Sequence, residues 1–369
     1  MHPMIKPALR RAWRDRQTVQ YGVAPSHAVL LGPVDNTTAG FMELMDGTRS
    51  LVQLREEAAR VGLPPGTADR LVDRLSSAGV LDDATADREA AASVSDQLRP
   101  DLGSLSVVHR EPGGGLRRLV ARREACVQVR GAGRVGSLVA STLSAAGVGE
   151  VDVVDGGHVE PWDTTPGGIP AGEVGERRDV AASRAVGRAW PWRSRTRARS
   201  RGKVGLVVLT PRDGLDAYAP DPATSEGFVE AGTPHLFGGV VESTGVVGPL
   251  VLPGASPCAG CLLRGRAERE PSWPLVVGQW RTSGRRRSGV PACDSALATM
   301  VAGAIASYAL SFLDGDGDCA AGYRVRFALP HLMGDTEQFS PHPECPCGAA
   351  SVTADRPPSA GVVEEVTMA

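Results

Sequence analysis

The stretch VRGAGRVGSLVAS, residues 129–141, joins a glycine-rich turn to the start of a helical pattern. The residues before it, ACVQVR, form a short apolar strand pattern that ends in the turn. The helical pattern ends at Gly147, and EVDVVD, residues 150–155, then forms a second strand pattern. A β-α-β unit of about 30 residues with this turn is typical of a Rossmann-type nucleotide-binding fold.

Four residues of this unit are candidate nucleotide ligands. Gly131, Gly133 and Gly136 lie where the strand turns into the helix, and the N-terminal amides of a helix can bind phosphate. Asp155 ends the second strand, where a carboxylate can hold a ribose hydroxyl. The same glycines also permit close packing of helix and strand, so the turn predicts the fold more strongly than nucleotide binding.

Composition and charge exclude several classes of protein. The chain has 369 residues, a length that suggests about two domains. Its hydrophobic content of 42% is enough to form buried cores. Its net charge of −2 argues against a nucleic-acid-binding protein, and we expect the basic segment 190–203 to be an exposed loop. The uncharged run 295–313 is long enough to span a bilayer, but its Ala and Ser content and its flanking Asp294 and Asp314 favour a buried helix. We therefore expect a cytoplasmic protein with no membrane partner.

Residues 1–82 form a separate unit by pattern. Two short strand patterns, RQTVQYGV and HAVLLGPV, are followed by three helical stretches, at 37–44, 51–61 and 66–78. This order predicts a small winged-helix-like α+β domain, with a purely structural or dimerisation role as the alternative.

The rest of the chain divides into three parts. Residues 83–102 are predominantly polar and Ala-rich, and we expect a linker. Residues 103–349 are predicted to form the Rossmann-like α/β domain, in which VGLVVL adds a parallel strand and 235–254 adds two more strands. Residues 350–369 are expected to form a disordered tail.

Closely spaced cysteines suggest a metal site. Cys258 and Cys261 form a C-x-x-C pair, and Cys345 and Cys347 form a C-x-C pair. In a reducing compartment such pairs favour metal ligands, and four thiolates predict a closed, structural zinc site. Two unrelated thiol pairs, a redox C-x-x-C and His342 as a competing ligand are the alternatives. The remaining cysteines are expected to be small buried residues without a catalytic role: Cys126, Cys293 and Cys319.

In their order along the chain, these motifs resemble one family. The order is GAGRVG, Asp155, VGPLVLPG, C-x-x-C, ACDSALATMVAGAIASYAL and C-P-C. The family is the ThiF/MoeB/HesA superfamily of ubiquitin-activating-like adenylyltransferases. The block 235–276 is similar to the branch associated with YcaO cyclodehydratases and azole-containing peptides. The block WRDRQTVQYGV…LMDGT resembles the PqqD-like leader-peptide recognition element. The resemblance covers residues 8–82 and 103–349.

This resemblance implies activation of a C-terminal carboxylate with ATP and magnesium, and a homodimer. The family's S-N-x-x-R-Q stretch is replaced here by DTTPGGIPAGE, which has no Arg, Asn or Gln. Arg178 stands where the family has a Lys, and Asp213 falls near the magnesium-binding acid. Because the missing Arg would stabilise the transition state, and Arg does not replace Lys neutrally, we expect Arg178 and Asp213 to be remnants of a degenerate site.

Three functions remain open from the sequence. In the first, the N-terminal element binds a precursor peptide as an added strand beside the 18–32 hairpin and against a helix at 66–78. The inactive domain then presents that peptide to an ATP-using partner such as a YcaO enzyme. In the second, the protein is an active ATP-dependent adenylyltransferase of a peptide or small-protein C-terminus. In the third, it is a structural subunit or a dinucleotide-binding protein that uses Asp155 for the ribose.

Overall fold

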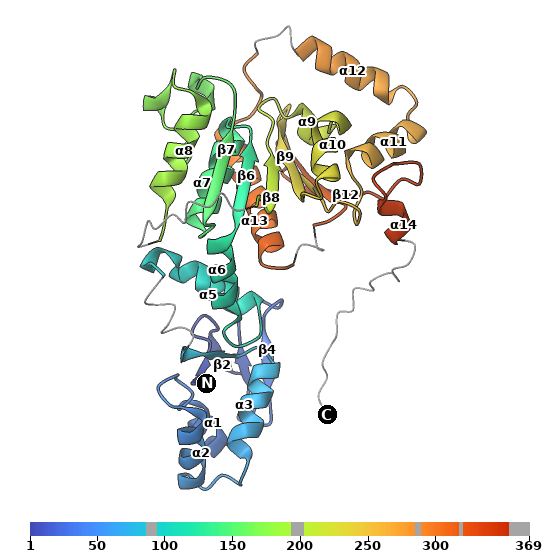
Figure 1. Cartoon of the computed structure of the whole chain (residues 1–369). Helices are drawn as coiled ribbons and strands as arrows, with labels where there is room; N and C mark the ends of the chain where they lie inside the picture. Colours follow the sequence, from blue (N-terminus) through green and yellow to red (C-terminus); the bar gives the residue numbers. More distant parts are fainter. Residues whose placement is uncertain (86–93, 193–202, 285–288, 317–319, 354–369) are drawn as a thin grey trace.

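The computed structural model describes residues 1–85, 94–192, 203–284, 289–316 and 320–353. A small N-terminal domain lies below a larger α/β domain, and helices α5 (Arg99–Val108) and α6 (Gly114–Glu124) lie between them (Figure 1). Three parts of the sequence predictions lie outside the described residues: Cys319, most of the basic segment 190–203, and residues 354–369 of the predicted tail. Residues 350–353 belong to helix α14 (Ala349–Thr353) rather than to a disordered tail that begins at 350.

The N-terminal domain packs helices against a three-stranded antiparallel sheet in the order β2-β3-β4. Strands β3 and β4 lie within the two predicted strand patterns, whereas β2 was not predicted. Tyr21, Phe41 and Leu54 fill the core between sheet and helices. The elements are β2 (Arg11–Trp13), β3 (Val19–Tyr21), β4 (Val29–Leu31), α1 (Asn36–Met42), α2 (Leu51–Arg60) and α3 (Thr67–Ser77).

The first and last strands of this domain pair with each other. β1 (Pro3–Ile5) runs antiparallel to β5 (Leu81–Asp83), so the boundary predicted after residue 82 falls inside a strand. The predicted linker is also partly helical, because it contains η1 (Asp96–Leu98) and the start of α5.

Two buried charged residues attach the N-terminal domain to the α5–α6 hairpin. Lys6 is fully buried, and its ammonium group donates to the carbonyl oxygens of Ser106, His109 and Arg110 at 2.6, 3.3 and 3.1 Å. Asp82 accepts hydrogen bonds from the Ser106 hydroxyl and from the backbone amide of Gly113, both at 2.6 Å. Because buried charges are costly unless they are satisfied, these contacts hold the domain in one position.

The main domain is built on a seven-stranded mixed sheet in the order β12-β11-β10-β9-β8-β6-β7. Strands β7, β6, β8 and β9 are parallel, and β9 to β12 are antiparallel. The mixed Rossmann-like sheet is therefore confirmed, and β11 and β12 are additions. The strands are β6 (Cys126–Arg130), β7 (Glu150–Val154), β8 (Leu206–Leu209), β9 (His235–Val241), β10 (Thr244–Val251), β11 (Tyr323–Ala328) and β12 (Gly334–Gln338).

Helix α13 (Ser295–Leu313) is the uncharged run of the sequence, and it packs on β9 and β10 beside α7 (Arg134–Ala145). A Cβ atom on Gly245 would lie 2.3 Å from Val301, and one on Gly238 would lie 2.3 Å from Ile305. These two glycines let the helix lie close to the sheet. By length and composition α13 is the one helix in the described ranges that could cross a membrane, but its packed face belongs to the main core.

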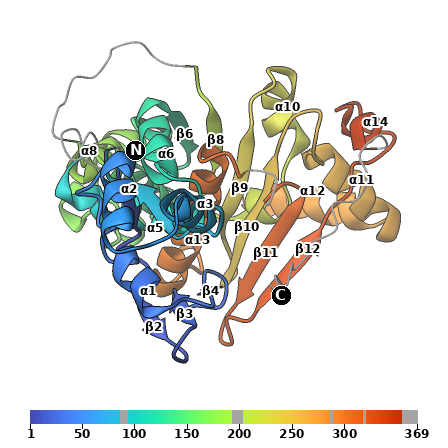
Figure 2. The same ribbon diagram turned by 90° about the horizontal axis from the view of Figure 1, so that it is seen from below.

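The remaining helices surround this sheet (Figures 1 and 2). They are η2 (Pro161–Asp163), η3 (Ala171–Glu173), α8 (Arg178–Ala189), α9 (Leu215–Tyr218), α10 (Pro222–Glu230), α11 (Ala259–Arg269) and α12 (Trp273–Gly284).

Candidate functional site

Packing alone requires two of the three glycines in the turn between β6 and α7. Gly131 has φ of +105°, and a Cβ atom there would lie 2.0 Å from the carbonyl oxygen of Thr210. A Cβ atom on Gly136 would lie 1.9 Å from the carbonyl oxygen of Gly131. Gly133 is less constrained, because its Cβ would meet only the Arg212 side chain, at 3.0 Å. Gly131 and Gly136 are thus accounted for without a bound phosphate.

Asp155, the predicted ribose ligand, makes its hydrogen bonds within the chain. Its carboxylate accepts from the backbone amides of Ala132 at 2.8 Å and Gly157 at 2.9 Å. It also accepts from Nε of Arg178 at 2.9 Å, and its side chain is only 9% exposed. The carboxylate therefore ties the glycine turn to the start of α8.

Arg178 lies against this carboxylate as the first residue of α8. Its guanidinium also donates to the carbonyl oxygen of His158 at 2.7 Å and lies 3.5 Å from the carboxylate of Asp163. A Cβ atom on Gly157 would lie 2.0 Å from the guanidinium, so that glycine makes room for it. The structure thus brings Arg178 and Asp155 together as partners of each other.

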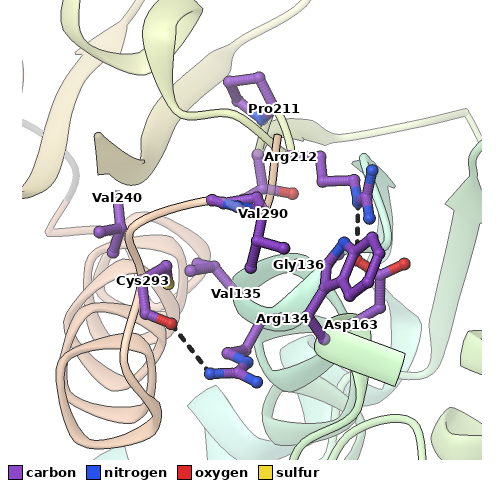
Figure 3. Close-up of a pocket in the computed structure, with 13 residues that line it drawn as sticks. Arg134, Val135, Gly136, Asp163, Pro211, Arg212, Val240, Val290 and Cys293 are labelled. Atoms are coloured by element: carbon purple, nitrogen blue, oxygen red, sulfur yellow. Dashed lines mark hydrogen bonds and ion pairs between the residues drawn. The ribbon is translucent and has the colours of Figure 1, made fainter. Parts of the chain in front are cut away.

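A second ion-pair group, which the sequence analysis missed, crosses the same region. Nε of Arg212 donates to the carboxylate of Asp163 at 2.7 Å (Figure 3). Its Nη2 pairs with Glu160. The Asp163 side chain is 2% exposed and lies between Arg178 and Arg212. The available signal was the segment EPWD, whose Asp163 is also the first residue of DTTPGGIPAGE, together with an arginine directly before Asp213.

Asp213, the candidate magnesium ligand, is not part of this group. It is exposed, and its carboxylate accepts from the backbone amide of Leu215 at 3.2 Å. It therefore stabilises the start of α9 and does not line the cavity beside the glycine turn.

The cavity beside the turn is small. It measures about 60 Å³, whereas small-molecule sites measure roughly 300–1,000 Å³. Arg134 donates to the carbonyl oxygen of Cys293 at 2.9 Å and so holds the segment before α13 over the turn (Figure 3). Burial raises the pKa of the Cys293 thiol, which is not activated as a nucleophile. With these side chains in place, the cavity is smaller than a site for a small molecule.

The four predicted metal ligands meet at one point. The Sγ atoms of Cys258, Cys261, Cys345 and Cys347 all lie within 4.8 Å of one another, and three of their separations are 3.9, 3.6 and 3.5 Å. A tetrahedral ion with metal–sulfur bonds of about 2.3 Å places its ligands about 3.8 Å apart. The hydrogen bond between Cys258 and Cys261 lowers the pKa of Cys261 to about 4 and raises the pKa of Cys258. The cluster fits a metal ion.

His342 lies beside this cluster but is not a ligand. Its Nε2 atom lies 2.9 Å from a carboxylate oxygen of Glu268, and its Nδ1 atom accepts from the backbone amide of Glu344 at 3.1 Å. Both ring nitrogens are therefore in use. Glu268 lies on α11 with Cys261, so the contact with His342 fixes the second cysteine pair against the first.

A family model described as the ThiF family matches residues 114–347. The chain belongs to the ThiF family. The predicted family and the Rossmann-like α/β fold are thereby confirmed.

Several solved structures share the fold of this ThiF-family protein. E. coli MccB with ATP is 14% identical, with a TM-score of 0.69 over 94% of this chain and 99% of that one. The microcin C7 biosynthetic enzyme MccB in complex with N-formylated MccA is 13% identical, with a TM-score of 0.67 over 94% and 100%. The heterocyclase TruD is 17% identical, with a TM-score of 0.60 over 95% of this chain and 43% of TruD. No curated protein matches the sequence.

Proposed function

We propose that this ThiF-family protein binds a precursor, or leader, peptide and presents it to a partner enzyme of peptide modification, in a pathway of the azole or thiazole (TOMM) kind. The observation that carries this proposal is the closed adenylation site. Arg178 pairs with Asp155, Arg212 pairs with Asp163, and only about 60 Å³ remains beside the turn. MccB, which has the same fold, is known in complex with N-formylated MccA, and TruD is a heterocyclase.

The N-terminal domain offers an edge for the peptide. β4 is the last strand of its sheet, and Leu30 on it is 49% exposed. Arg74 of α3 donates to the carbonyl oxygen of Gly32 at 2.9 Å, so the helix lies beside the end of that strand. An extended peptide can add to such an edge through main-chain hydrogen bonds and place its side chains against the helix. This arrangement supports a winged-helix-like, PqqD-like recognition element.

Leu30→Glu is expected to weaken binding of the precursor peptide about tenfold or more, because it places a charge at an apolar contact of the edge strand. Val52→Glu on α2 is the matched control, since Val52 is also exposed, at 59%, but lies away from β4. Fluorescence anisotropy with peptides encoded beside the gene measures both affinities. Equal affinities for the two variants would contradict the proposed site.

The alternative is an active ATP-dependent adenylyltransferase, which the complex of MccB with ATP favours. The closed site predicts that ATP–pyrophosphate exchange stays at background with any precursor peptide, and that millimolar ATP with magnesium leaves the melting temperature unchanged. Asp155→Ala is expected to leave peptide binding intact. Peptide-dependent exchange by the wild-type protein would establish the adenylyltransferase instead.

We further propose that the metal of the cysteine cluster is structural zinc, since four thiolates leave no open coordination position. A YcaO-type enzyme is the ATP-using partner we propose, because the block 235–276 is similar to the branch associated with YcaO cyclodehydratases. We place the protein in the cytoplasm, where reduced thiolates are available to bind metal.

A homodimer completes this proposal, and the outward face of α13 is the surface that supports it. Ala296, Gly303 and Ser307 on that face are exposed, and the helix has no charged residue over its whole length. A helix that is apolar all round is normally covered. In a two-fold interface a residue near the axis meets its own copy, which an uncharged face permits.

A further inference from the structure

One edge of the main sheet has a free strand beside a group of arginines. β12 is the last strand in the sheet order, and within the described ranges no strand pairs with its outer side. Figure 2 shows β12 at the end of the sheet, next to β11. A free strand edge exposes backbone amide and carbonyl groups that can pair with another chain.

Two adjoining hollows run from this edge into the domain. The outer one lies between α11 and β12, and the inner one, of about 30 Å³, is lined partly by aromatic rings of Tyr218, Trp273 and Phe339. Arg266, Arg269 and Glu337 line both hollows. We call the two together the β12 groove.

The floor of the β12 groove is rigid and its charges are paired. Arg324 is 4% exposed, lies between the rings of Tyr218 and Phe339, and donates to Glu337 at 2.6 Å. Arg326 pairs with Asp335 at 2.7 Å. Since both acidic residues of β12 are thus neutralised by β11, they do not repel an acidic ligand at the edge.

The rim of the groove carries unneutralised positive charge. Arg266 lies over the ring of Trp273 at 4.2 Å and pairs with Glu270 at 3.2 Å. Arg269, one turn further along α11, is exposed and makes no ion pair or hydrogen bond through its side chain in the part of the chain that is described. Two guanidinium groups, with one carboxylate between them, therefore lie beside a strand edge.

The geometry points to a second peptide-binding edge: β12 binds an extended, acidic peptide segment as an additional strand. Main-chain hydrogen bonds to β12 supply affinity, and alternate side chains of the added strand face α11, where Arg266 and Arg269 select carboxylates. On the opposite face of β11, Val325 and Phe327 are half-buried, so that face favours apolar side chains. The preferred ligand is thus a strand in which acidic and apolar residues alternate. This site is separate from β4 and does not depend on the proposed function.

The test uses the full chain and fluorescein-labelled peptides of alternating Glu and Val, with Lys in place of Glu as the opposite charge. We expect the Glu–Val peptide to bind and the Lys–Val peptide not to bind, with an affinity that falls as salt is added. Arg269→Glu, alone and combined with Arg266→Glu, is expected to weaken binding about tenfold or more. Arg264→Glu is the matched control, because Arg264 is exposed on the same helix but lines neither hollow.

N-methylation of alternate peptide amides tests the added strand itself, since it removes the main-chain donors on one edge. Methylation of the edge that faces β12 is expected to abolish binding, whereas methylation of the outer edge is expected to leave it intact. Hydrogen exchange of β12 amides is expected to slow when the unmodified peptide is present. Binding that is independent of peptide charge, or that survives N-methylation of each edge in turn, overturns the proposal, as does no binding at all. Loss of binding in Leu30→Glu assigns the peptide to the N-terminal sheet and overturns it too.

Discussion

Gly136→Ala is expected to destabilise the α/β domain by about 3 kcal/mol or more, in the absence of any nucleotide. Its Cβ atom would lie 1.9 Å from the carbonyl oxygen of Gly131 and 2.5 Å from the hydroxyl of Thr210. Neither group can move easily. The backbone amide of Thr210 donates to the carbonyl oxygen of Arg130 at 2.8 Å, and the backbone amide of Ala132 in the turn donates to the carboxylate of Asp155 at 2.8 Å.

Gly133→Ala is the matched control in the same turn. Gly133 has φ of −72° and ψ of −165°, which any residue adopts, and its Cβ would come no closer than 3.0 Å to another atom, the Cγ of Arg212. We expect a cost of about 1 kcal/mol or less. Urea unfolding followed by circular dichroism measures both variants. Similar costs for the two would mean that packing does not decide which glycines the turn needs.

The sequence predicted the β6-α7-β7 unit well because its information is local. Apolar strand patterns, a helix with a continuous buried face and the glycines that join them all lie within residues 126–154. β11 and β12 were missed. β12 is a polar edge strand without an apolar pattern, whereas β11 does alternate Tyr323, Val325 and Phe327 with arginines, a strand signal that the sequence analysis did not use.

In the candidate site, too, the sequence predicted some features and missed others. A carboxylate at the end of β7 has the same sequence signal whether it faces a ribose or an arginine. What distinguishes the two cases is Arg178, whose contact with Asp155 depends on where α8 begins. Arg212 and Asp163 were missed because their ion pair forms only after two distant loops meet.

The cysteine cluster was predictable because closely spaced cysteine pairs are typical of metal sites. Spacing identified the four ligands, and the structure brings their sulfur atoms together. It did not reveal that His342 would hold the cluster through Glu268, since that contact joins α11 to the loop after β12.

Cys258→Ser is expected to release the metal and to unfold the C-terminal part of the domain at a much lower temperature than in the wild type. Metal binding to a structural site is coupled to folding and is worth on the order of 10 kcal/mol in small zinc domains. Here the cluster joins α11 to the segment that follows β12, so its loss also frees residues 339–353.

Cys293→Ser is the matched control, because Cys293 lies outside the cluster. Elemental analysis is expected to find about one zinc per chain in the wild type and in Cys293→Ser, and none in Cys258→Ser. A chelator is expected to reproduce the Cys258→Ser unfolding curve in the wild type. A well-folded wild-type protein without metal would refute the zinc site, because four thiols within 4.8 Å of one another, three of them buried, would then have to be stable by themselves.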